Sequence, residues 1–492
     1  MKQWFTIRKT NANLAWYLLI LLCLVIAFDL CESASAEGYT QAIPLQYDEA
    51  KGFHEGLAAV MIGEKWGFID RAGNEVVPLK YDYAYDFHDG LAAVVIDEEL
   101  GYIDRMGTEV VPPKYWSAYA DTYDFHDGMA RVMTDGKCGF IDRTGTEIIP
   151  LRYDYAYDFH DGLALVMLGP SDYPEIWDIV DGQKCGLIDK TGKEVVPVEY
   201  DKIGKFHEGL ACVIKNGKLG FVDEIGAVVV PLIYESSLPS DMAWYQDIMP
   251  FFSEGVAAIW GGEEHNGQYG YIDREGRVVI PFAYDYAAPF SEGLAYVSTG
   301  ASLWYETNKD GKFGYINKAG YVVVPLEYDC DYVGHGILFD WRFIDGFAQV
   351  SQKGTSLWDA KYGLVDREGK EVVPIRYHWL RRIDDRLSFA GYGEDYSGHG
   401  TWDSIGLIDS TGQELVAVDH YAWIGDFVEG YAWVRYGGEG GEWIGDEESR
   451  FGFINKAGQE IVPCIFEATG DFSEGLAPVM MNGKWGYIAI VE

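Results

Sequence analysis

Short runs of alternating apolar and polar residues, separated by turn residues, fill most of the chain, and one arrangement of them returns many times. In its first full copy, GLAAVMI at residues 56–62 precedes a turn and KWGFID at residues 65–70. Alternation over such short lengths predicts β-strands with one buried face. EVVP at residues 75–78 predicts a third strand that ends at Pro78, because proline has no N–H for pairing. Each unit is therefore predicted to be a three-stranded antiparallel meander followed by a loop.

The turns of this unit have their own sequence signals. Asn216-Gly217 lies between two apolar runs of a later copy, and Asn-Gly at such a place is a strong hairpin signal. Asp70 precedes a turn in which Gly73 can take a positive φ, and its carboxylate can accept backbone hydrogen bonds from the residues ahead. Asn317 and Asn455 replace this aspartate in two copies. Because asparagine can accept the same bonds, this position is predicted to be structural.

The glycine of KWGFID recurs eleven times at intervals of 34 to 50 residues. The copies are Gly67, Gly101, Gly139, Gly186, Gly220, Gly270, Gly314, Gly363, Gly406, Gly452 and Gly486. A second motif, FHEGLA at residues 53–58 in its first copy, travels with it. Such periodic self-similarity indicates a stacked repeat architecture, in which each unit buries its faces against its neighbours.

We therefore predict an all-β protein in which residues 37–492 form about eleven tandem three-stranded meanders in a superhelical, solenoid-like array, with an irregularity near residues 376–425. One or two β-propeller-like rings are the alternative. AIPLQYD at residues 42–48 matches a third strand and KWGYI at residues 484–488 matches a second strand, so the first strand could complete the last unit. Eleven units exceed the usual four to eight blades, and 34 residues are few for a four-stranded blade. Both considerations favour the open array.

The first 36 residues have the layout of a secretory signal peptide, with a basic start, an apolar run at residues 14–28 and small residues at 34–36. An uncleaved N-terminal anchor is the rival interpretation. No later segment approaches membrane-spanning length, so no membrane span is expected after signal removal. We predict an exported protein that is extracellular, on the cell surface or in the periplasm.

Charge and composition narrow the class of partner. The chain has 38 Lys and Arg against 78 Asp and Glu, a formal net charge of −40. Nucleic acid is a poor partner for so acidic a protein, since backbone binding needs a basic surface. A content of 48% hydrophobic and 15% aromatic residues excludes a disordered acidic tail. The composition leaves the oligomeric state open.

KWGFID at residues 65–70, KWGYI at residues 484–488, the following VVP and the FxEGLA motif resemble the WG-repeat family of bacterial proteins. The resemblance covers about residues 40–492. It implies a secreted or surface β-repeat protein of largely undefined function. It supplies no catalytic residues and implies no cofactor.

Histidines and carboxylates recur inside the motifs. Five copies place histidine after the phenylalanine of FxEG: His54, His88, His126, His160 and His207. Serine, isoleucine and valine fill this position elsewhere, which favours a structural role; the alternative is a row of imidazoles that binds a transition metal or becomes charged together at about pH 6. The FxEG carboxylates are expected to accept backbone hydrogen bonds in their own turn. Diffuse calcium binding by the acidic surface is a further alternative, and no specific metal site is predicted.

The cysteines are odd in number after the signal segment and scattered: Cys138, Cys185, Cys212, Cys330 and Cys464. This pattern fits neither a disulfide framework nor a zinc site. We expect buried thiols that replace apolar side chains. A bridge between Cys138 and Cys185, in adjacent repeats, stays open.

Patterns that carry catalysis are missing from the sequence. The nucleophile elbow, HExxH, Walker A, GxGxxG and CxxC motifs do not occur in usable form. We therefore predict a non-enzymatic binding or scaffold module. The alternatives are a carbohydrate-active enzyme and an envelope structural or calcium-binding protein.

Variation in repeat length points to a binding surface. The extra residues gather between the GLA strand and the WG strand, at 169–183, 261–267, 299–311, 353–360, 390–404 and 436–449. Insertions at one point of successive repeats are expected on one side of an array. They contain tryptophans among Asp, Glu, Gly and Ser: Trp177, Trp304, Trp358, Trp402 and Trp443. We predict that these tryptophans bind a ligand, either a polysaccharide or a protein of the cell envelope. The alternative is that each tryptophan folds back to cover its own meander.

Overall fold

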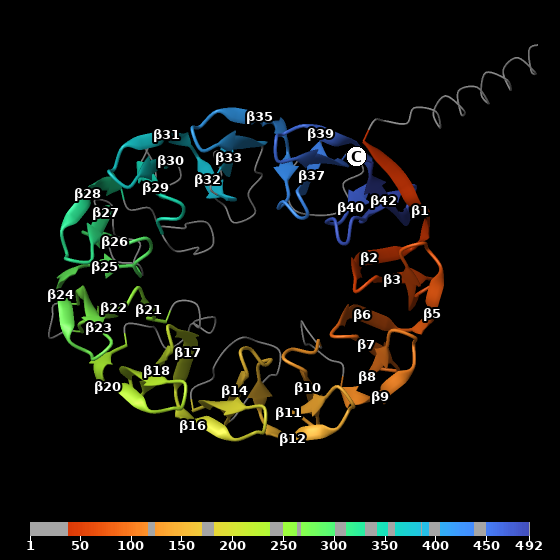
Figure 1. Cartoon of the computed structure of the whole chain (residues 1–492), viewed down its shortest axis with the longest axis horizontal. Coiled ribbons are helices and arrows are strands. Elements are labelled where there is room, and N and C mark those ends of the chain that lie inside the picture. Colours follow the sequence, from red (N-terminus) through yellow and green to blue (C-terminus); the bar gives the residue numbers. More distant parts are fainter. Residues whose placement is uncertain are drawn as a thin grey trace, which may run out of the picture.

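The computed structural model describes residues 38–116, 124–169, 182–236, 249–262, 267–300, 311–329, 342–352, 360–384, 386–392, 404–436 and 449–491. These residues form eleven small antiparallel sheets and no helix. The sheets follow one another around a central opening and close into a ring (Figure 1). The protein is therefore an eleven-bladed β-propeller. The solenoid-like array favoured by the sequence is wrong, and the propeller alternative is confirmed.

Blades 1 to 5 run in chain order. Blade 1 contains β2 (Glu49–His54), β3 (Leu57–Ile62), β4 (Lys65–Asp70) and β5 (Glu75–Tyr81). Blade 2 contains β6 (Tyr83–His88), β7 (Leu91–Ile96), β8 (Glu99–Asp104) and β9 (Glu109–Trp116). Blade 3 contains β10 (Met129–Thr134), β11 (Lys137–Asp142) and β12 (Glu147–Tyr153). Blade 4 contains β13 (Tyr155–Ala156), β14 (Leu163–Leu168), β15 (Lys184–Asp189) and β16 (Glu194–Tyr200). Blade 5 contains β17 (Lys202–His207), β18 (Leu210–Lys215), β19 (Lys218–Asp223) and β20 (Val228–Glu235).

Blades 6 to 11 complete the ring. Blade 6 contains β21 (Phe252–Ser253), β22 (Val256–Trp260), β23 (Tyr269–Asp273) and β24 (Val278–Tyr284). Blade 7 contains β25 (Tyr286–Ala287), β26 (Leu294–Thr299), β27 (Lys312–Asn317) and β28 (Val322–Asp329). Blade 8 contains β29 (Phe347–Gln352), β30 (Lys361–Asp366) and β31 (Glu371–Tyr377). Blade 9 contains β32 (Trp379–Arg382), β33 (Leu387–Tyr392), β34 (Ser404–Asp409) and β35 (Glu414–Tyr421). Blade 10 contains β36 (Trp423–Ile424), β37 (Tyr431–Tyr436), β38 (Arg450–Asn455) and β39 (Glu460–Phe466). Blade 11 contains β40 (Ala468–Thr469), β41 (Ala477–Met481), β42 (Lys484–Ile490) and β1 (Tyr39–Tyr47).

The expected three-stranded meander lacks one strand. The segment after the third strand, predicted to be a loop, holds the innermost strand of the next blade; after β5 this strand is β6. Four strands fit into 34 residues because the connections are very short. Glu55-Gly56 and Gly63-Glu64 are two-residue turns, residues 71–74 make the third turn, and Asp82 alone separates β5 from β6. Glu55 and Gly56 both take positive φ, at 53° and 78°, which allows so tight a turn.

The motif glycine is required by a close approach of two strands. A Cβ atom on Gly67 would lie 2.5 Å from the carbonyl oxygen of Val77 and 2.8 Å from the nitrogen of Leu79. The register explains this, since Trp66 pairs with Tyr81 and Phe68 with Val77, so that β5 bulges between its two contacts. Pairing therefore continues past Pro78, contrary to expectation, because proline is tolerated inside a bulge. All eleven motif glycines make this approach, which explains why the motif is repeated.

The two ends of the described chain close the ring. β1 pairs with β42, with Tyr39 opposite Ile490 and Gln41 opposite Ile488. β1 is the outermost strand of blade 11 (Figure 1). Gly486 approaches the carbonyl oxygen of Ile43 as Gly67 approaches Val77. The first strand thus completes the last unit, as the sequence alternative stated.

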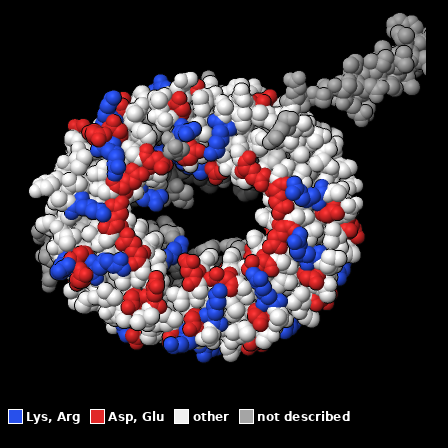
Figure 2. Space-filling view, viewed as in Figure 1, with Lys and Arg blue, Asp and Glu red and all other residues white. Residues whose placement is uncertain are grey.

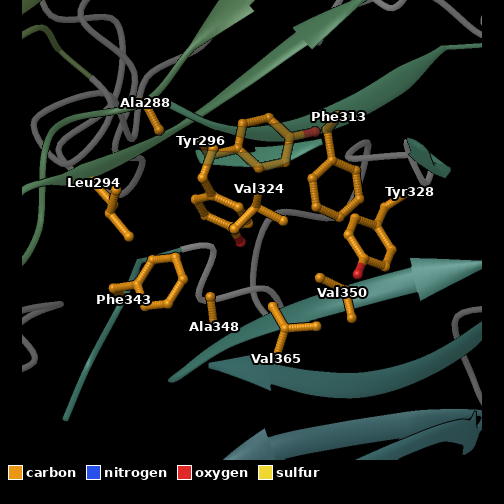
Figure 3. Packing of buried hydrophobic residues seen from close by; sticks show 11 residues of the cluster. Ala288, Leu294, Tyr296, Phe313, Val324, Tyr328, Phe343, Ala348, Val350 and Val365 are labelled. Atoms are coloured by element: carbon orange, nitrogen blue, oxygen red, sulfur yellow. The ribbon is translucent and has the colours of Figure 1, made fainter. Parts of the chain in front are cut away.

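Aromatic pairs hold neighbouring blades together. Phe68 of blade 1 meets Phe87 of blade 2 edge to face, with ring centroids 4.7 Å apart. Seven more junctions have an aromatic pair at the same place, edge to face except for the tilted pair Tyr271–Phe290: Tyr102–Phe125, Phe140–Phe159, Phe221–Phe252, Tyr271–Phe290, Tyr315–Phe343, Phe453–Phe472 and Tyr487–Phe53. Figure 3 shows the junction of blades 7 and 8, where Phe343 and Ala348 face Tyr296 and Val324 across the sheets. Each blade therefore buries both faces against its neighbours, and burial of one such ring contributes about 1.5–3 kcal/mol.

Antiparallel strands divide the connections between two faces of the ring. The turns from first to second strand and from third to fourth strand lie on one face, which we call the turn face. The hairpins from second to third strand and the links between blades lie on the other, the hairpin face. First strands such as β2 and β6 border the central opening, and fourth strands such as β5 and β9 follow the outer rim (Figure 1).

Candidate binding faces

Carboxylates on the turn face join successive blades. The N–H of Gly90 donates to Glu55 of the preceding blade at 2.9 Å, and the N–H of Gly56 donates to Glu474 at 3.0 Å, which closes the circle. Five further junctions have the same bond: Gly162 to Asp127, Gly255 to Glu208, Gly293 to Glu254, Gly346 to Glu292 and Gly475 to Glu429. The expectation that these carboxylates serve their own turn is wrong, because each accepts from the next blade.

Basic side chains reinforce the same junctions. Arg105 donates to the carbonyl oxygen of Glu55, and Arg71 donates to that of Glu474 at 2.5 Å. Arg143 forms an ion pair with Asp89 of the preceding blade at 2.5 Å. Figure 2 shows the result, with Asp and Glu gathered around the central opening and Lys and Arg beside them. The carboxylates named above therefore have a structural role, because they bind groups of a neighbouring blade.

The aspartate turns behave as the sequence predicts. Asp70 accepts from the N–H groups of Ala72 at 2.9 Å and Asn74 at 2.8 Å. Asn317 accepts the equivalent bonds, at 3.1 Å from Ala319 and 3.0 Å from Tyr321. Asparagine therefore replaces aspartate here without loss of a bond.

On the hairpin face, a second set of aspartates joins blades. Asp82 accepts from the Lys65 ammonium of blade 1 and from the N–H of Asp97 in blade 2 at 2.8 Å. Asp48 likewise accepts from Lys484 at 2.5 Å and from the N–H of Gly63 at 2.8 Å. The lysine first and the backbone N–H second lower the pKa of both carboxyl groups.

Imidazoles of blades 1 to 4 lie in a row beside aspartates. The rings of His54 and His88 are 5.6 Å apart, and those of His126 and His160 are 5.4 Å apart. His54 Nε2 lies 3.6 Å from Asp86 of the next blade. Where serine replaces histidine it also reaches the next blade, as Ser253 Oγ donates to the Phe290 carbonyl at 2.6 Å. The position thus contributes to the junction with either residue.

Two aspartates before an FxEG phenylalanine, Asp124 and Asp471, have raised pKa values, but this position recurs in other blades and does not mark a single catalytic pair. Burial raises the pKa of Asp124, against the opposing effect of His88. Burial and the neighbouring charge of Asp426 also raise the pKa of Asp471. Both aspartates, with Asp86 and Asp426, precede the FxEG phenylalanine of their blades. Within the described residues, no three His, Cys, Asp or Glu side chains converge as metal ligands would.

The cysteines of the described residues are free thiols. Cys138 and Cys185 are buried in separate core clusters, so the alternative of a bridge between them is wrong. Burial raises the pKa of Cys185 to about 12, which keeps this thiol protonated and inert. Cys330 lies outside the described residues.

Trp177, Trp304, Trp358, Trp402 and Trp443 lie outside the described residues, as do residues 1–36. The strands that flank the tryptophan insertions are described. Leu168 pairs with Lys184, and Thr299 pairs with Lys312, each at the end of a hairpin. The insertions of blades 4 and 6 to 10 therefore all begin and end on the hairpin face. Among the described residues, no helix has the length and apolar character needed to cross a membrane.

Several solved structures resemble the chain at low sequence identity. A eukaryotic initiation factor is 10% identical, with 78% of this chain and 91% of that chain covered and a TM-score of 0.36. The WD40 domain of SCAP from fission yeast is 9% identical, with 92% and 96% covered and a TM-score of 0.25. PorZ, a surface component of the type-IX secretion system of Porphyromonas gingivalis, is 11% identical, with 90% and 71% covered and a TM-score of 0.21. None superposes closely, so the propeller assignment rests on the strand pairing itself. No curated protein matches the chain in sequence.

A family model for the WG containing repeat matches nine segments that together span more than half of the chain. They are residues 40–66, 66–99, 101–138, 139–169, 186–218, 269–301, 362–385, 405–439 and 451–485. The matched segments contain eight of the eleven motif glycines and eight of the ten FxEG turns that build the blades. The chain belongs to the WG-repeat family.

Proposed function

We propose that the ring is an exported, non-catalytic binding module whose hairpin face holds a polysaccharide or a protein of the cell envelope. The residues assigned to binding are Trp177, Trp304, Trp358, Trp402 and Trp443. The observation that carries the proposal is that the insertions of six blades share one connection. Five of these blades, 6 to 10, are consecutive in the ring. The described ends of these insertions therefore follow an arc along one face, the arrangement expected of an extended binding surface.

The composition of the insertions suits two ligand classes. Tryptophan rings offer broad apolar faces against which sugar rings stack, and carboxylates beside them accept hydrogen bonds from hydroxyl groups. The same groups suit a basic peptide, through cation–π contacts and charge. Both classes are compatible with a net charge of −40, which disfavours anionic ligands.

A scaffold role is favoured over catalysis by how the carboxylates are used. A glycoside hydrolase needs one pair of carboxylates whose environments differ from those of their neighbours. Here the turn-face and hairpin-face carboxylates accept bonds that repeat from blade to blade. Asp471, whose pKa is raised, occupies a position that Asp86, Asp124 and Asp158 share in other blades.

Retention on immobilised envelope polysaccharides, together with capture of secreted proteins, tests the proposal. The chain without residues 1–36 contains both β1 and β42, and therefore the whole ring. We expect it to be retained, and we expect the triple substitution Trp177→Ala, Trp358→Ala and Trp443→Ala to abolish retention without lowering the melting temperature.

Trp116→Ala is the matched control, because Trp116 is 40% exposed at the hairpin-face end of β9, in a blade without an insertion. It should leave retention unchanged. The proposal would be overturned if the triple variant were retained as well as the wild type. It would also be overturned if the wild type bound none of the envelope polysaccharides and captured no secreted protein.

A further inference from the structure

Three consecutive blades break the charge pattern of the outer rim. The first residue of the fourth strand is glutamate in seven blades: Glu75, Glu109, Glu147, Glu194, Glu371, Glu414 and Glu460. The equivalent position in blade 11, two residues into β1, is Gln41. In blades 5, 6 and 7 it is Val228, Val278 and Val322. β20, β24 and β28, which begin with these valines, follow one another along the rim (Figure 1).

The replacement removes both partners of an ion pair. In charged sectors, a base near the end of one outer strand reaches the glutamate of the next blade, as Lys80 reaches Glu109 at 3.8 Å and Arg376 reaches Glu414 at 3.4 Å. At the junction of blades 5 and 6, the same two positions are Ile233 and Val278. At the next junction they are Ala283 and Val322. The pairwise loss of charge is the signature of a surface built to be apolar.

The resulting surface is exposed. Ile225 is 80% exposed, Tyr321 71% and Ile233 62%. With them, five valines form what we call the rim patch: Val228, Val229, Val278, Val279 and Val322. These eight residues are almost half of the seventeen large apolar residues exposed in the part of the chain that the structure describes.

The rim patch is continuous across its blades. A Cβ atom on Gly276 of blade 6 would lie 3.2 Å from Val230 of blade 5, and one on Gly320 of blade 7 would lie 3.5 Å from Ile280 of blade 6. Tyr234 also donates to the Gly276 carbonyl at 2.8 Å. The turn of each blade thus lies against the outer strand of the preceding one, which places the rim patch residues of the three blades side by side.

The area and charge of the rim patch fit a particular partner. Its side chains expose on the order of 700 Å², near the roughly 800 Å² that each partner contributes to a standard interface and above the roughly 300–600 Å² typical of a monomer's largest patch. Arg277, a cation within the patch, forms ion pairs with Asp273 at 2.6 Å and Glu275 at 2.7 Å, so these three side chains together carry a single negative charge. A basic partner would prefer the sectors that carry glutamate. A second copy, with its own charge of −40, meets least repulsion here.

Strand addition is blocked at this rim. Pro231, Pro281 and Pro325 are exposed on the outer strands and have no N–H to offer an added strand. A partner must therefore pack against the side chains.

We propose that two copies of this chain associate through their rim patches as a symmetric dimer. A two-fold axis beside β24 brings β20 of one copy next to β28 of the other, so that apolar residues meet apolar residues on both sides. This inference is independent of the ligand proposed for the hairpin face.

Analytical ultracentrifugation of the chain without residues 1–36 tests the dimer. The wild type should sediment at twice the mass of one chain at micromolar concentrations. The triple substitution Val228→Glu, Val278→Glu and Val322→Glu should give monomers, with a dissociation constant raised at least ~100-fold, because like charges would face each other without partners. Folding should persist, since glutamate occupies these positions in seven other blades.

Met106→Glu with Ile148→Glu provides the control, because both residues are exposed on the rim of other blades. This variant should remain dimeric. Higher salt should tighten the wild-type dimer, since it screens repulsion between two acidic rings. A wild type that is monomeric at about 100 μM, or a Val-to-Glu variant that dimerises like the wild type, would overturn the proposal.

Discussion

Blades 1 to 3 and blades 6 to 8 have the same framework and differ in what they add to it. Blades 1 to 3 have two-residue hairpins, histidine after the FxEG phenylalanine and glutamate on the rim. Blades 6 to 8 have long insertions at the hairpin, and serine or isoleucine replaces the histidine. Blades 6 and 7 also carry valine on the rim. The motif glycine is present in all six blades, and the aromatic contact joins blades 1, 2, 3, 6 and 7 to the blade that follows each of them. The buried positions that join blades are therefore largely constant, whereas the more exposed positions, including some that also reach the next blade, differ between the two arcs.

Substitutions at the aromatic contacts between blades should have the largest effect on stability, and the effect should be similar in the two arcs. Phe87→Ala in the first arc and Phe343→Ala in the second should each lower the free energy of unfolding by about 3–5 kcal/mol. Both rings are almost fully buried against the preceding blade, so truncation leaves a cavity in each arc. Chemical denaturation followed by tryptophan fluorescence measures the change. Losses that differ by more than about 2 kcal/mol between the arcs would show that the framework is not equivalent.

Acidification should destabilise some blade junctions more than others, depending on which residue links the two blades. The pKa values of Asp48 and Asp82 are lowered in the folded ring, first by their lysine partners. A carboxyl group with a lowered folded pKa stabilises the ring above its unfolded pKa, and this contribution is lost as the pH falls below about 4. Blade-resolved hydrogen exchange should therefore show loss of protection at blades 1 and 2 on acidification.

The link after blade 8 is the internal reference for this experiment. His378 occupies the aspartate position there and contacts Lys361. Blade 8 should not share the acid-dependent loss that the Asp48 and Asp82 carboxylates cause. Asp82→Asn should remove the pH dependence at its own junction. Simultaneous loss of protection in all blades would contradict this assignment.

The smallest expected effect concerns the aspartate turns. Asp70→Asn should change the free energy of unfolding by less than about 0.5 kcal/mol, because Asn317 already makes the same two backbone bonds in blade 7. Asp70→Ala removes both bonds and should cost about 1–2 kcal/mol. Urea denaturation of the two variants beside the wild type distinguishes these values. A large loss for Asp70→Asn would mean that the charge, and hence a bound cation, matters at this turn.

Much of the blade could be predicted from residues near one another in the chain. The hairpin at Asn216-Gly217, the aspartate turns and the strands KWGFID and GLAAVMI follow from local patterns. The innermost strand was missed because YDYAYDF is rich in tyrosine and aspartate, and only its packing against the next strand distinguishes it from a loop. The bulge at Pro78 was missed because a missing N–H suggests a strand end, whereas in the ring it coincides with the approach of Gly67.

The position of the insertions was also predictable, because their flanks align between strands that pair in every repeat. The partners of the FxEG carboxylates were not. Glu55 has a glycine N–H beside it in its own turn and another, Gly90, in the next blade. The two candidates have the same sequence context, so no local pattern could choose between them.

The sequence by itself determined three strands of the unit, the number of units and their need for neighbours, since these depend on periodicity, turn residues and apolar content. Tertiary structure alone decided that the array closes. Eleven units can form either an open superhelix or a closed ring, and the small rotation between successive blades decides which. That rotation is set by contacts such as Phe68–Phe87 and by hydrogen bonds such as that from Gly90 to Glu55. Such rotations add up around the chain, and the bond from Gly56 to Glu474 exists only if their sum is a full circle.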